Sequence, residues 1–157
     1  MSAPDSPIRI LTLATQETHA LAARIAALSA PVDCIALRGD LGAGKTEFSR
    51  AFIQSLCGAS IEVTSPTFTL VQDYDAGDHK LWHFDLYRLE DENELDELGL
   101  SDMLQSGRVL IEWPDLADDR LPENRLDISI SFEDDEITRC FTLHPHGVWK
   151  DKVKHFG

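Results

Sequence analysis

The sequence is poor in the features that mark secreted, membrane-spanning or metal-stapled proteins. Its three cysteines, Cys34, Cys57 and Cys140, are odd in number and show no C-x-x-C spacing, so they suggest neither a disulfide framework nor a zinc site. We interpret them as buried thiols in a reducing cytosol. No run of about 18 apolar residues occurs, and residues 1–7 have no charged-then-apolar signal pattern. We therefore expect a soluble, cytoplasmic protein without membrane contact.

Positive charge is also scarce. The chain has 14 Lys and Arg residues against 28 Asp and Glu residues, which gives a formal net charge of -14. Since affinity for nucleic-acid phosphates comes mainly from clustered Lys and Arg, this balance argues against a broad nucleic-acid surface. If the pathway of this protein involves RNA, we expect a partner to hold it.

The length of 157 residues allows one domain with a real core and leaves no room for a second. We expect this domain to occupy residues 1–148. Residues 149–157 form a short, lysine-containing segment without a strong apolar period, so we expect a frayed C-terminal tail there.

One stretch stands out, because residues 39–46 fit the phosphate-binding pattern G-x-x-x-x-G-K-[ST]. The apolar run 34–37 is typical of a buried parallel strand, and Lys45 to about Cys57 is predicted to be a helix. This order directs backbone N–H groups and the positive end of a helix dipole at an anion, which favours a nucleotide site over an ordinary glycine-rich turn. Lys45 would reach the β- and γ-phosphates, and Thr46 would offer its hydroxyl to Mg²⁺. The stretch consists of Gly39, Asp40, Leu41, Gly42, Ala43, Gly44, Lys45 and Thr46.

The remaining pattern predicts an α/β fold with a P-loop NTPase-like, mixed and mainly parallel sheet that is flanked by helices. Predicted strands at 69–74 and 80–85 surround a turn at 75–78, and they should add an antiparallel hairpin to the sheet. The acidic segment 86–104 suggests one or two short helices. Further strands are expected at residues 8–13, 109–111, 126–132 and 139–143.

Two segments have two interpretations each. Residues 64–68, Thr-Ser-Pro-Thr-Phe, lie where a P-loop GTPase would carry its nucleotide-sensing switch, and an ordinary turn leading into a strand is an equal alternative. The acidic run at 90–97 is most simply a solvated helix face, and a surface that docks a partner is the alternative.

A P-loop also needs an acidic group at the carboxyl end of a neighbouring strand, to hold Mg²⁺ or to orient the attacking water. Asp85 and Glu112 both end a predicted strand. We favour Glu112 for the metal, because an uninterrupted apolar run precedes it, whereas His83 interrupts the strand that leads to Asp85. A structural carboxylate that caps a turn is the alternative for Glu112. His83 itself is interpreted as a packed or hydrogen-bonded strand residue.

Four motifs stand in order along the chain. They are Gly-Asp-Leu-Gly-Ala-Gly-Lys-Thr from Gly39, Thr-Ser-Pro-Thr-Phe-Thr-Leu-Val from Thr64, His-Phe-Asp-Leu-Tyr-Arg-Leu from His83 and Ile-Glu-Trp-Pro from Ile111. Together with the small size, they resemble the TsaE (YjeE) family, bacterial P-loop ATPases that are required for making N6-threonylcarbamoyladenosine in tRNA. One motif alone would indicate only a phosphate loop, whereas the four at these spacings are specific. The resemblance spans about residues 10–132.

The resemblance implies an ATP- and Mg²⁺-dependent ATPase of low intrinsic activity. It implies that this protein supports a complex of TsaD, the threonylcarbamoyl-transferase subunit, with its paralogue TsaB, and does not itself carry out the transfer. By the same analogy Lys45 contacts phosphates, Thr46 and Glu112 hold Mg²⁺, and Asp85 orients water or the metal shell. Lys45, Asp85 and Glu112 would thus be the catalytic residues.

The resemblance also implies the surroundings of the nucleotide. Ser65 and Thr67 would lie in a switch-like loop beside the γ-phosphate, Trp113 would cover the nucleotide, and residues 15–18 are a candidate adenine contact. One departure concerns Glu47, which stands where the family often has a second threonine. Its charge suits the helix dipole, and we expect its side chain to face away from the phosphates.

Two other functions are possible on the sequence alone. A small P-loop kinase would share the loop, but we find no Arg-rich lid for a phosphate acceptor. A nucleotide-dependent binding switch would also share it, although the guanine-reading N-K-x-D motif is absent.

Overall fold

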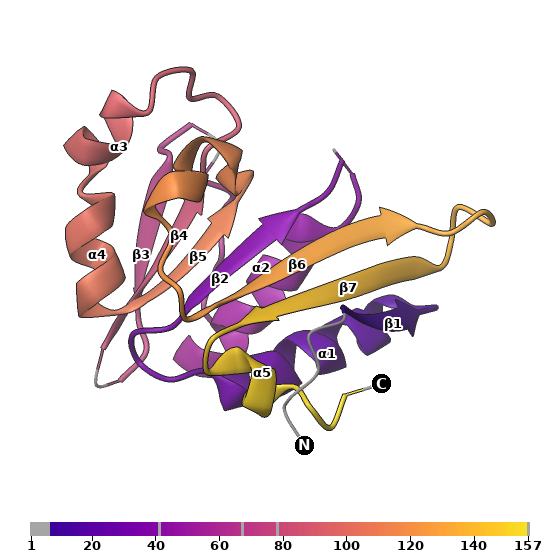
Figure 1. Cartoon of the computed structure of the whole chain (residues 1–157). Coiled ribbons are helices and arrows are strands. Elements are labelled where there is room, and N and C mark those ends of the chain that lie inside the picture. Colours follow the sequence, from indigo (N-terminus) through magenta and orange to yellow (C-terminus); the bar gives the residue numbers. More distant parts are fainter. Residues whose placement is uncertain (1–6, 41, 67, 78, 157) are drawn as a thin grey trace.

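A computed structural model describes residues 7–40, 42–66, 68–77 and 79–156 of the chain, so Asp78 of the predicted hairpin turn lies outside the described residues. Figure 1 shows a layer of strands with helices packed on both of its faces. In chain order the elements are β1 (Ile8–Thr12), α1 (Thr15–Leu28), β2 (Cys34–Arg38), α2 (Lys45–Cys57), β3 (Val71–Asp75), β4 (Lys80–Asp85), α3 (Asn93–Leu98), α4 (Leu100–Ser106), β5 (Arg108–Glu112), the 3-10 helix η1 (Pro114–Arg120), β6 (Arg125–Phe132), β7 (Arg139–His146) and α5 (Trp149–Lys152).

The strands of the described chain form one sheet in the order β1-β7-β6-β2-β5-β4-β3. The four central strands, β6, β2, β5 and β4, run parallel to one another. β3 joins as the antiparallel partner of β4, and β7 and β1 add antiparallel strands at the other edge. The predicted mixed α/β sheet with an antiparallel hairpin is therefore confirmed. Because the central strands are parallel, their carboxyl ends meet at one edge of the sheet, and the connection from β2 to α2 begins there.

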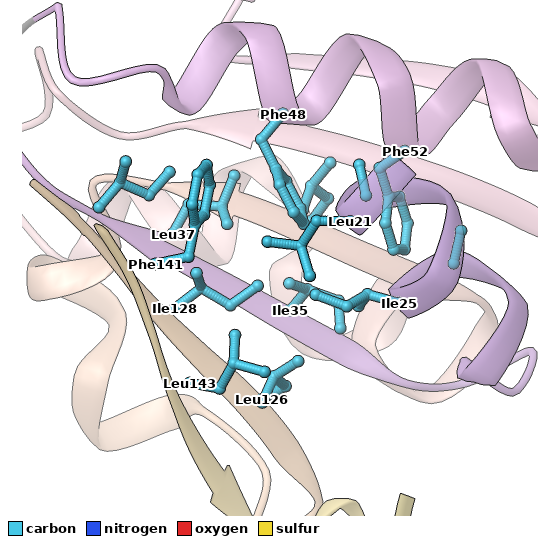
Figure 2. Close-up of a cluster of buried hydrophobic side chains, with 14 of the residues drawn as sticks. Leu21, Ile25, Ile35, Leu37, Phe48, Phe52, Leu126, Ile128, Phe141 and Leu143 are labelled. Carbon is cyan, nitrogen blue, oxygen red and sulfur yellow. The ribbon is translucent and has the colours of Figure 1, made fainter. Parts of the chain in front are cut away.

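α1 and α2 cover one face of the sheet, and the larger hydrophobic core lies between these helices and the strands (Figure 2). Phe48 and Phe52 lie on the same face of α2 because they are one helical turn apart, and their ring centroids are 6.2 Å apart. In Figure 2 both rings point from α2 toward the sheet. Phe48 also meets Phe141 of β7, with 5.9 Å between the ring centroids. This packing holds the N-terminus of α2, and the loop before it, against the sheet.

α3, α4 and η1 cover the opposite face of β4 and β5, and they enclose a smaller core that includes Phe84, Leu95 and Leu100. α3 falls within the predicted helical segment 86–104, whereas α4 begins inside it and ends two residues beyond it, at Ser106. Leu95 and Leu100 are fully buried, whereas the acidic side chains of residues 90–94 around them are exposed. A solvated helix face, one of the two interpretations of the acidic run, accounts for this arrangement.

The prediction of a frayed tail at residues 149–157 is wrong for the described part of that segment. Trp149 begins α5 and is fully buried, as is Val153, while Phe156 is 8% exposed. All three belong to the larger core, and the guanidinium carbon of Arg24 lies 4.0 Å from the centre of the Phe156 ring. Their i, i+4, i+7 spacing brings them to one side of the chain, but so short a segment does not reveal this period by itself.

The cysteines are free thiols, and Cys34 and Cys140 are buried as expected, whereas Cys57 is only half-buried. Burial raises the pKa of the Cys34 thiol to about 12, so the unreactive protonated form prevails at neutral pH. In the part of the chain that the structure describes, no helix combines the length and apolar character that crossing a membrane requires.

Candidate functional site

The phosphate loop, residues 39–46, links the carboxyl end of β2 to the first turn of α2. Gly39 and Gly44 have backbone φ angles of 149° and 116°, values that residues with a Cβ rarely adopt. Space is restricted as well, because a Cβ on Gly39 would lie 2.5 Å from the carbonyl oxygen of Ile130. A Cβ on Gly44 would lie 2.9 Å from the guanidinium of Arg139. These glycines therefore allow both the loop conformation and the close approach of β6 and β7.

The ammonium of Lys45 is held against the loop itself. Its Nζ donates to the carbonyl oxygens of Gly39 and Asp40, at 2.5 Å and 2.9 Å. The same nitrogen lies 4.0 Å from the centre of the Trp113 ring. Trp113 has a left-handed backbone, with φ 57° and ψ 59°, directly before Pro114. This conformation is unusual for a bulky residue before a proline, and it places the indole over the lysine.

A cavity of about 380 Å³, here called the loop cavity, opens beside the phosphate loop. It gathers side chains from the loop and α2, from the ends of β4 and β5, from the segment 64–68 and from the start of β7. The residues that line it are Gly42, Gly44, Lys45, Thr46, Glu47, Ser65, Asp85, Tyr87, Arg88, Glu112, Trp113 and Arg139. The three predicted catalytic residues are thus brought together with both predicted metal ligands.

Several predicted contact residues are not among those that line the loop cavity. Gly39 and Asp40 contribute their carbonyl oxygens to the lysine of the loop. Ala43 is 2% exposed and belongs to the larger hydrophobic core, while its backbone N–H donates to the carbonyl oxygen of Asp40 at 3.1 Å. Leu41 and Thr67 lie outside the described residues.

Glu112 ends β5 and is almost completely buried. Its Oε1 accepts a hydrogen bond from the Thr46 hydroxyl at 3.4 Å. Its Oε2 accepts one from the Ser49 hydroxyl at 3.2 Å, and it lies 2.6 Å from Nε2 of His83. The sequence interpretation of His83 as a hydrogen-bonded strand residue is therefore confirmed.

Thr46 and Glu112 fit a magnesium ion by the chemistry of their donor atoms. A hydroxyl and a carboxylate oxygen lie side by side at the wall of the loop cavity, and Mg²⁺ prefers such oxygen ligands. No cluster of three or more His, Cys, Asp and Glu side chains suited to a metal occurs among the described residues. A site with one or two protein ligands fits an ion that takes its other ligands from water and phosphate.

Asp85 ends β4, the parallel neighbour of β5, and it pairs in register with Glu112. Its carboxylate is buried and accepts a hydrogen bond from the backbone N–H of Tyr87 at 3.0 Å. Burial lowers the pKa of the Lys45 ammonium, while the negative charges of Glu112 and Asp85 act in the opposite direction. A partly desolvated cation beside two buried carboxylates is typical of a functional site.

The segment 64–68 reaches the loop cavity through Ser65, which lines it. The exposed ring of Phe68 lies over Arg88, with 4.5 Å between the guanidinium carbon and the ring centre. Since Arg88 also lines the cavity, this contact links the segment to the residues that follow β4. The position agrees with a switch-like turn, and its response to a nucleotide stays a prediction.

The sequence interpretation missed Tyr87, Arg88 and Arg139 as lining residues. Tyr87 and Arg88 stand in the motif from His83, two and three residues after Asp85, so the motif itself was the signal that could have found them. The ring of Tyr87 lies 4.7 Å from that of Trp113. Arg139 has no such local signal, because it reaches the loop only through the pairing of β7 with β6.

Glu47 largely follows the expectation that it faces away from the loop. Its carboxylate accepts from Nε2 of His19 in α1 at 2.6 Å and lies 3.8 Å from the guanidinium of Arg50. It nevertheless forms part of the rim of the loop cavity. The negative charge is therefore compensated by groups outside the loop.

A second cavity, of about 200 Å³, lies between the start of α1 and the start of β7. Its lining residues are Thr12, Leu13, Ala14, Thr15, Thr18, Ile137 and Arg139. Since Arg139 lines both cavities, the second cavity is a neighbour of the loop cavity. The segment 15–18, which is the candidate adenine contact, thus borders a space next to the phosphate loop.

Comparison with known proteins agrees with the resemblance seen in the sequence. The family model described as "Threonylcarbamoyl adenosine biosynthesis protein TsaE" matches residues 12–141. The tRNA threonylcarbamoyladenosine biosynthesis protein TsaE of Bacillus subtilis (strain 168) is 44% identical over 133 residues, which cover 83% of this chain and 82% of that protein. The protein of the same name from Rickettsia conorii is 37% identical over 131 residues, which cover 83% and 75% of the two chains.

A solved structure shows the same fold. The crystal structure of Bacillus subtilis YdiB matches this chain with a TM-score of 0.73 and 33% identity, and the match covers 94% of this chain and 90% of that one. The residues matched by the family model include the phosphate loop, Asp85, Glu112 and Arg139. The matched part of the chain therefore contains the lining of the loop cavity.

Proposed function

The chain belongs to the TsaE family of tRNA threonylcarbamoyladenosine biosynthesis proteins, and from this premise we propose that it binds ATP with Mg²⁺ and hydrolyses it slowly in support of that modification. The loop cavity is the observation that carries the proposal. There Lys45 and Thr46, at the start of α2, share one cavity with the carboxylate of Glu112. A phosphate loop combined with a buried acidic group at the end of a neighbouring strand is the arrangement that a nucleoside triphosphate with its metal requires.

In this proposal the phosphates of ATP lie in the loop cavity, at the N-terminus of α2. The backbone N–H groups and the helix dipole at this end favour an anion. A phosphate oxygen would replace the carbonyl oxygens of Gly39 and Asp40 as the acceptor for Lys45, because a charge-assisted hydrogen bond is stronger than one to a neutral carbonyl.

Thr46 and Glu112 would hold Mg²⁺, and a bound Mg²⁺ would neutralise charge on the phosphate oxygens. Asp85 ends the neighbouring strand and would orient the attacking water, while Trp113 would shield the phosphates from the side of η1. The donor atoms of Thr46 and Glu112 support the metal assignment, and the position of Asp85 in the same cavity supports its role.

The nucleoside is proposed to occupy the second cavity. Leu13 and Ile137 line it and are 66% and 70% exposed, so a flat, apolar base could cover them. Arg139, which lines both cavities, would then lie beside the bond between the sugar and the phosphates. Thr15 and Thr18 line the same cavity, which supports the family analogy that residues 15–18 contact the adenine.

TsaD and TsaB are the proposed partners, in the cytoplasm, and they would carry out the threonylcarbamoyl transfer. Ser65 and its neighbours would become ordered around the bound nucleotide for docking, and hydrolysis would release them. The net charge of -14 supports a division of labour in which the partners hold the tRNA.

Phosphate release from MgATP, measured with and without a TsaD/TsaB pair, tests the proposal. We expect slow hydrolysis that the pair accelerates. Absence of ATP binding, or absence of any effect or binding by the pair, would contradict the proposed function. Phosphate transferred to a small molecule instead of water would favour the kinase alternative.

Glu112→Gln tests the metal site within the same assay. The amide keeps the shape of the side chain but loses the negative charge, so we expect hydrolysis to fall about 100-fold, while ATP affinity in EDTA changes by less than about threefold. Glu123→Gln, at an exposed position, is the matched control. Unchanged hydrolysis in Glu112→Gln would move the metal role to Asp85.

A further inference from the structure

His83 lies within β4 and is fully buried, with its ring against Glu112 of the neighbouring strand. Its Nδ1 has no hydrogen-bond partner within the described part of the chain. A buried ring nitrogen without a partner costs free energy. The preceding residue on the same face of β4 is the buried, apolar Leu81. If packing alone decided which residue stands at position 83, an apolar side chain would be favoured there as well. The contact of Nε2 with Glu112 is therefore the feature that distinguishes this histidine.

Glu112 divides its two carboxylate oxygens between the protein core and the loop cavity. Oε2 contacts His83 at 2.6 Å and the buried hydroxyl of Ser49 at 3.2 Å. Oε1 instead faces the hydroxyl of Thr46, at 3.4 Å. Since an ionised carboxylate only accepts hydrogen bonds, both His83 and Ser49 donate to Oε2.

The two donors come from different elements, His83 from β4 and Ser49 from α2. Rotation of the carboxylate would break both hydrogen bonds, and each broken bond would leave a polar group unpaired in a buried place. His83 makes the closer of the two contacts that fix the orientation of Glu112.

We propose that His83 is a positioning residue for the magnesium site, which holds Oε2 of Glu112 so that Oε1 faces the Thr46 hydroxyl. The inference rests on the proposed function and concerns a residue that touches neither nucleotide nor metal. Carboxylates that bind metals are commonly held by such hydrogen bonds, and loss of these partners typically weakens metal affinity about 10- to 100-fold.

Three substitutions at this position test the proposal. Gln can bring an amide nitrogen near the place of the histidine Nε2, Asn is one methylene too short to do so, and Leu fills the space without a donor. We expect His83→Asn and His83→Leu to reduce, about tenfold, the gain in ATP affinity that Mg²⁺ gives over EDTA. His83→Gln should keep this gain within about threefold of the wild-type protein.

Isothermal titration calorimetry with ATP, in Mg²⁺ and in EDTA, measures this gain directly. Electron paramagnetic resonance of Mn²⁺ bound to the ATP-loaded protein gives an independent readout of metal affinity. Affinity for ATP in EDTA should stay within about twofold for every variant, because a positioning role concerns only the metal. A merely structural role would instead lower affinity under both conditions.

His144→Leu is the matched control, because His144 also lies in a strand of the sheet but lines a different cavity, together with Arg38 and Asp127. It should behave as the wild-type protein does. If His83→Leu does not fold in a thermal unfolding assay, the Gln and Asn variants still decide the question. Both carry a side-chain amide, and they differ only in whether it is long enough to reach Glu112.

The outcomes separate the inference from the function on which it rests. If the wild-type protein binds ATP more tightly with Mg²⁺ and His83→Asn retains this gain, the positioning role is wrong while the proposed function stands. The same holds if His83→Gln loses the gain as fully as His83→Asn does. If the wild-type protein binds no ATP, or binds it without any gain from Mg²⁺, the function fails and the inference fails with it.

Discussion

The phosphate loop and the wall opposite it are built in different ways. The loop is one continuous stretch, residues 39–46, and its shape follows from its glycines and from the start of α2. The opposite wall takes Asp85 from the end of β4, Glu112 from the end of β5 and Arg139 from the start of β7. The loop is therefore a local structure, whereas the wall exists only when the strands are assembled in their order.

This difference separates two kinds of contribution to the site. In the proposed function, the loop offers phosphate its own backbone groups and Lys45, which lie within one stretch of the chain. The wall places charges at distances that depend on register, such as the pairing of Asp85 with Glu112 across two parallel strands. We expect substitutions in the loop to affect nucleotide binding most, and those in the wall to have smaller and more selective effects.

Lys45→Ala should have the largest effect. The substitution removes a buried cation that lies inside the loop, so we expect MgATP affinity to fall at least about 100-fold. Isothermal titration calorimetry measures the affinity, and thermal unfolding checks that the loss of the hydrogen bonds to Gly39 and Asp40 leaves the fold intact. Lys154→Ala, at an exposed position, should bind as the wild-type protein does. Unchanged affinity in Lys45→Ala would show that the loop does not hold the phosphates.

Arg139→Ala should have an intermediate effect, and it tests whether the wall extends to β7. A cation next to Gly44 that lines both cavities is expected to contribute about tenfold to ATP affinity. The same titration measures it, with Arg9→Ala on the neighbouring strand β1 as the control. If Arg139→Ala lost more ATP affinity than Lys45→Ala does, the wall and not the loop would contribute most to nucleotide binding.

Glu47→Gln should have the smallest effect, although Glu47 directly follows the loop. Its carboxylate is hydrogen-bonded to His19 of α1 and lies near the guanidinium of Arg50 of α2, and such partly exposed contacts contribute little. We expect ATP affinity to change by less than about threefold in a fluorescence competition assay with a labelled nucleotide. A gain in ATP affinity of tenfold or more would mean that Glu47 repels the phosphates. Its position next to the loop would then matter more than the fact that its side chain points away.

Much of the fold could be predicted because its signals are short in range. The glycine pattern, the apolar run of β2 and the helix from Lys45 to Cys57 lie within two dozen residues, and the structure has all three in place. The hairpin of β3 and β4 and the strands β6 and β7 also follow local alternation and turn chemistry. Glu112 and Asp85 could be identified because strand ends at one edge of a parallel sheet converge.

Other features could not be predicted, because their signal lies in distant parts of the chain. Arg139 has no motif, and only the pairing of β7 with β6 carries it to the loop. Trp149 looks like part of a polar tail until the core beneath it is assembled. The hydrogen bond of His83 with Glu112 also has no local signal, because the two residues meet only through the pairing of β4 with β5.

The amino-acid sequence alone predicts a phosphate loop between a strand and a helix, because glycine conformation, helix formation and the apolar run act over neighbouring residues. Tertiary structure decides what faces that loop. The orientation of Glu112 by His83 and Ser49, the approach of Arg139 and the burial of Trp149 all depend on contacts between segments that the sheet order brings together. Such contacts form only when distant segments pack, so they leave no periodic trace in the sequence.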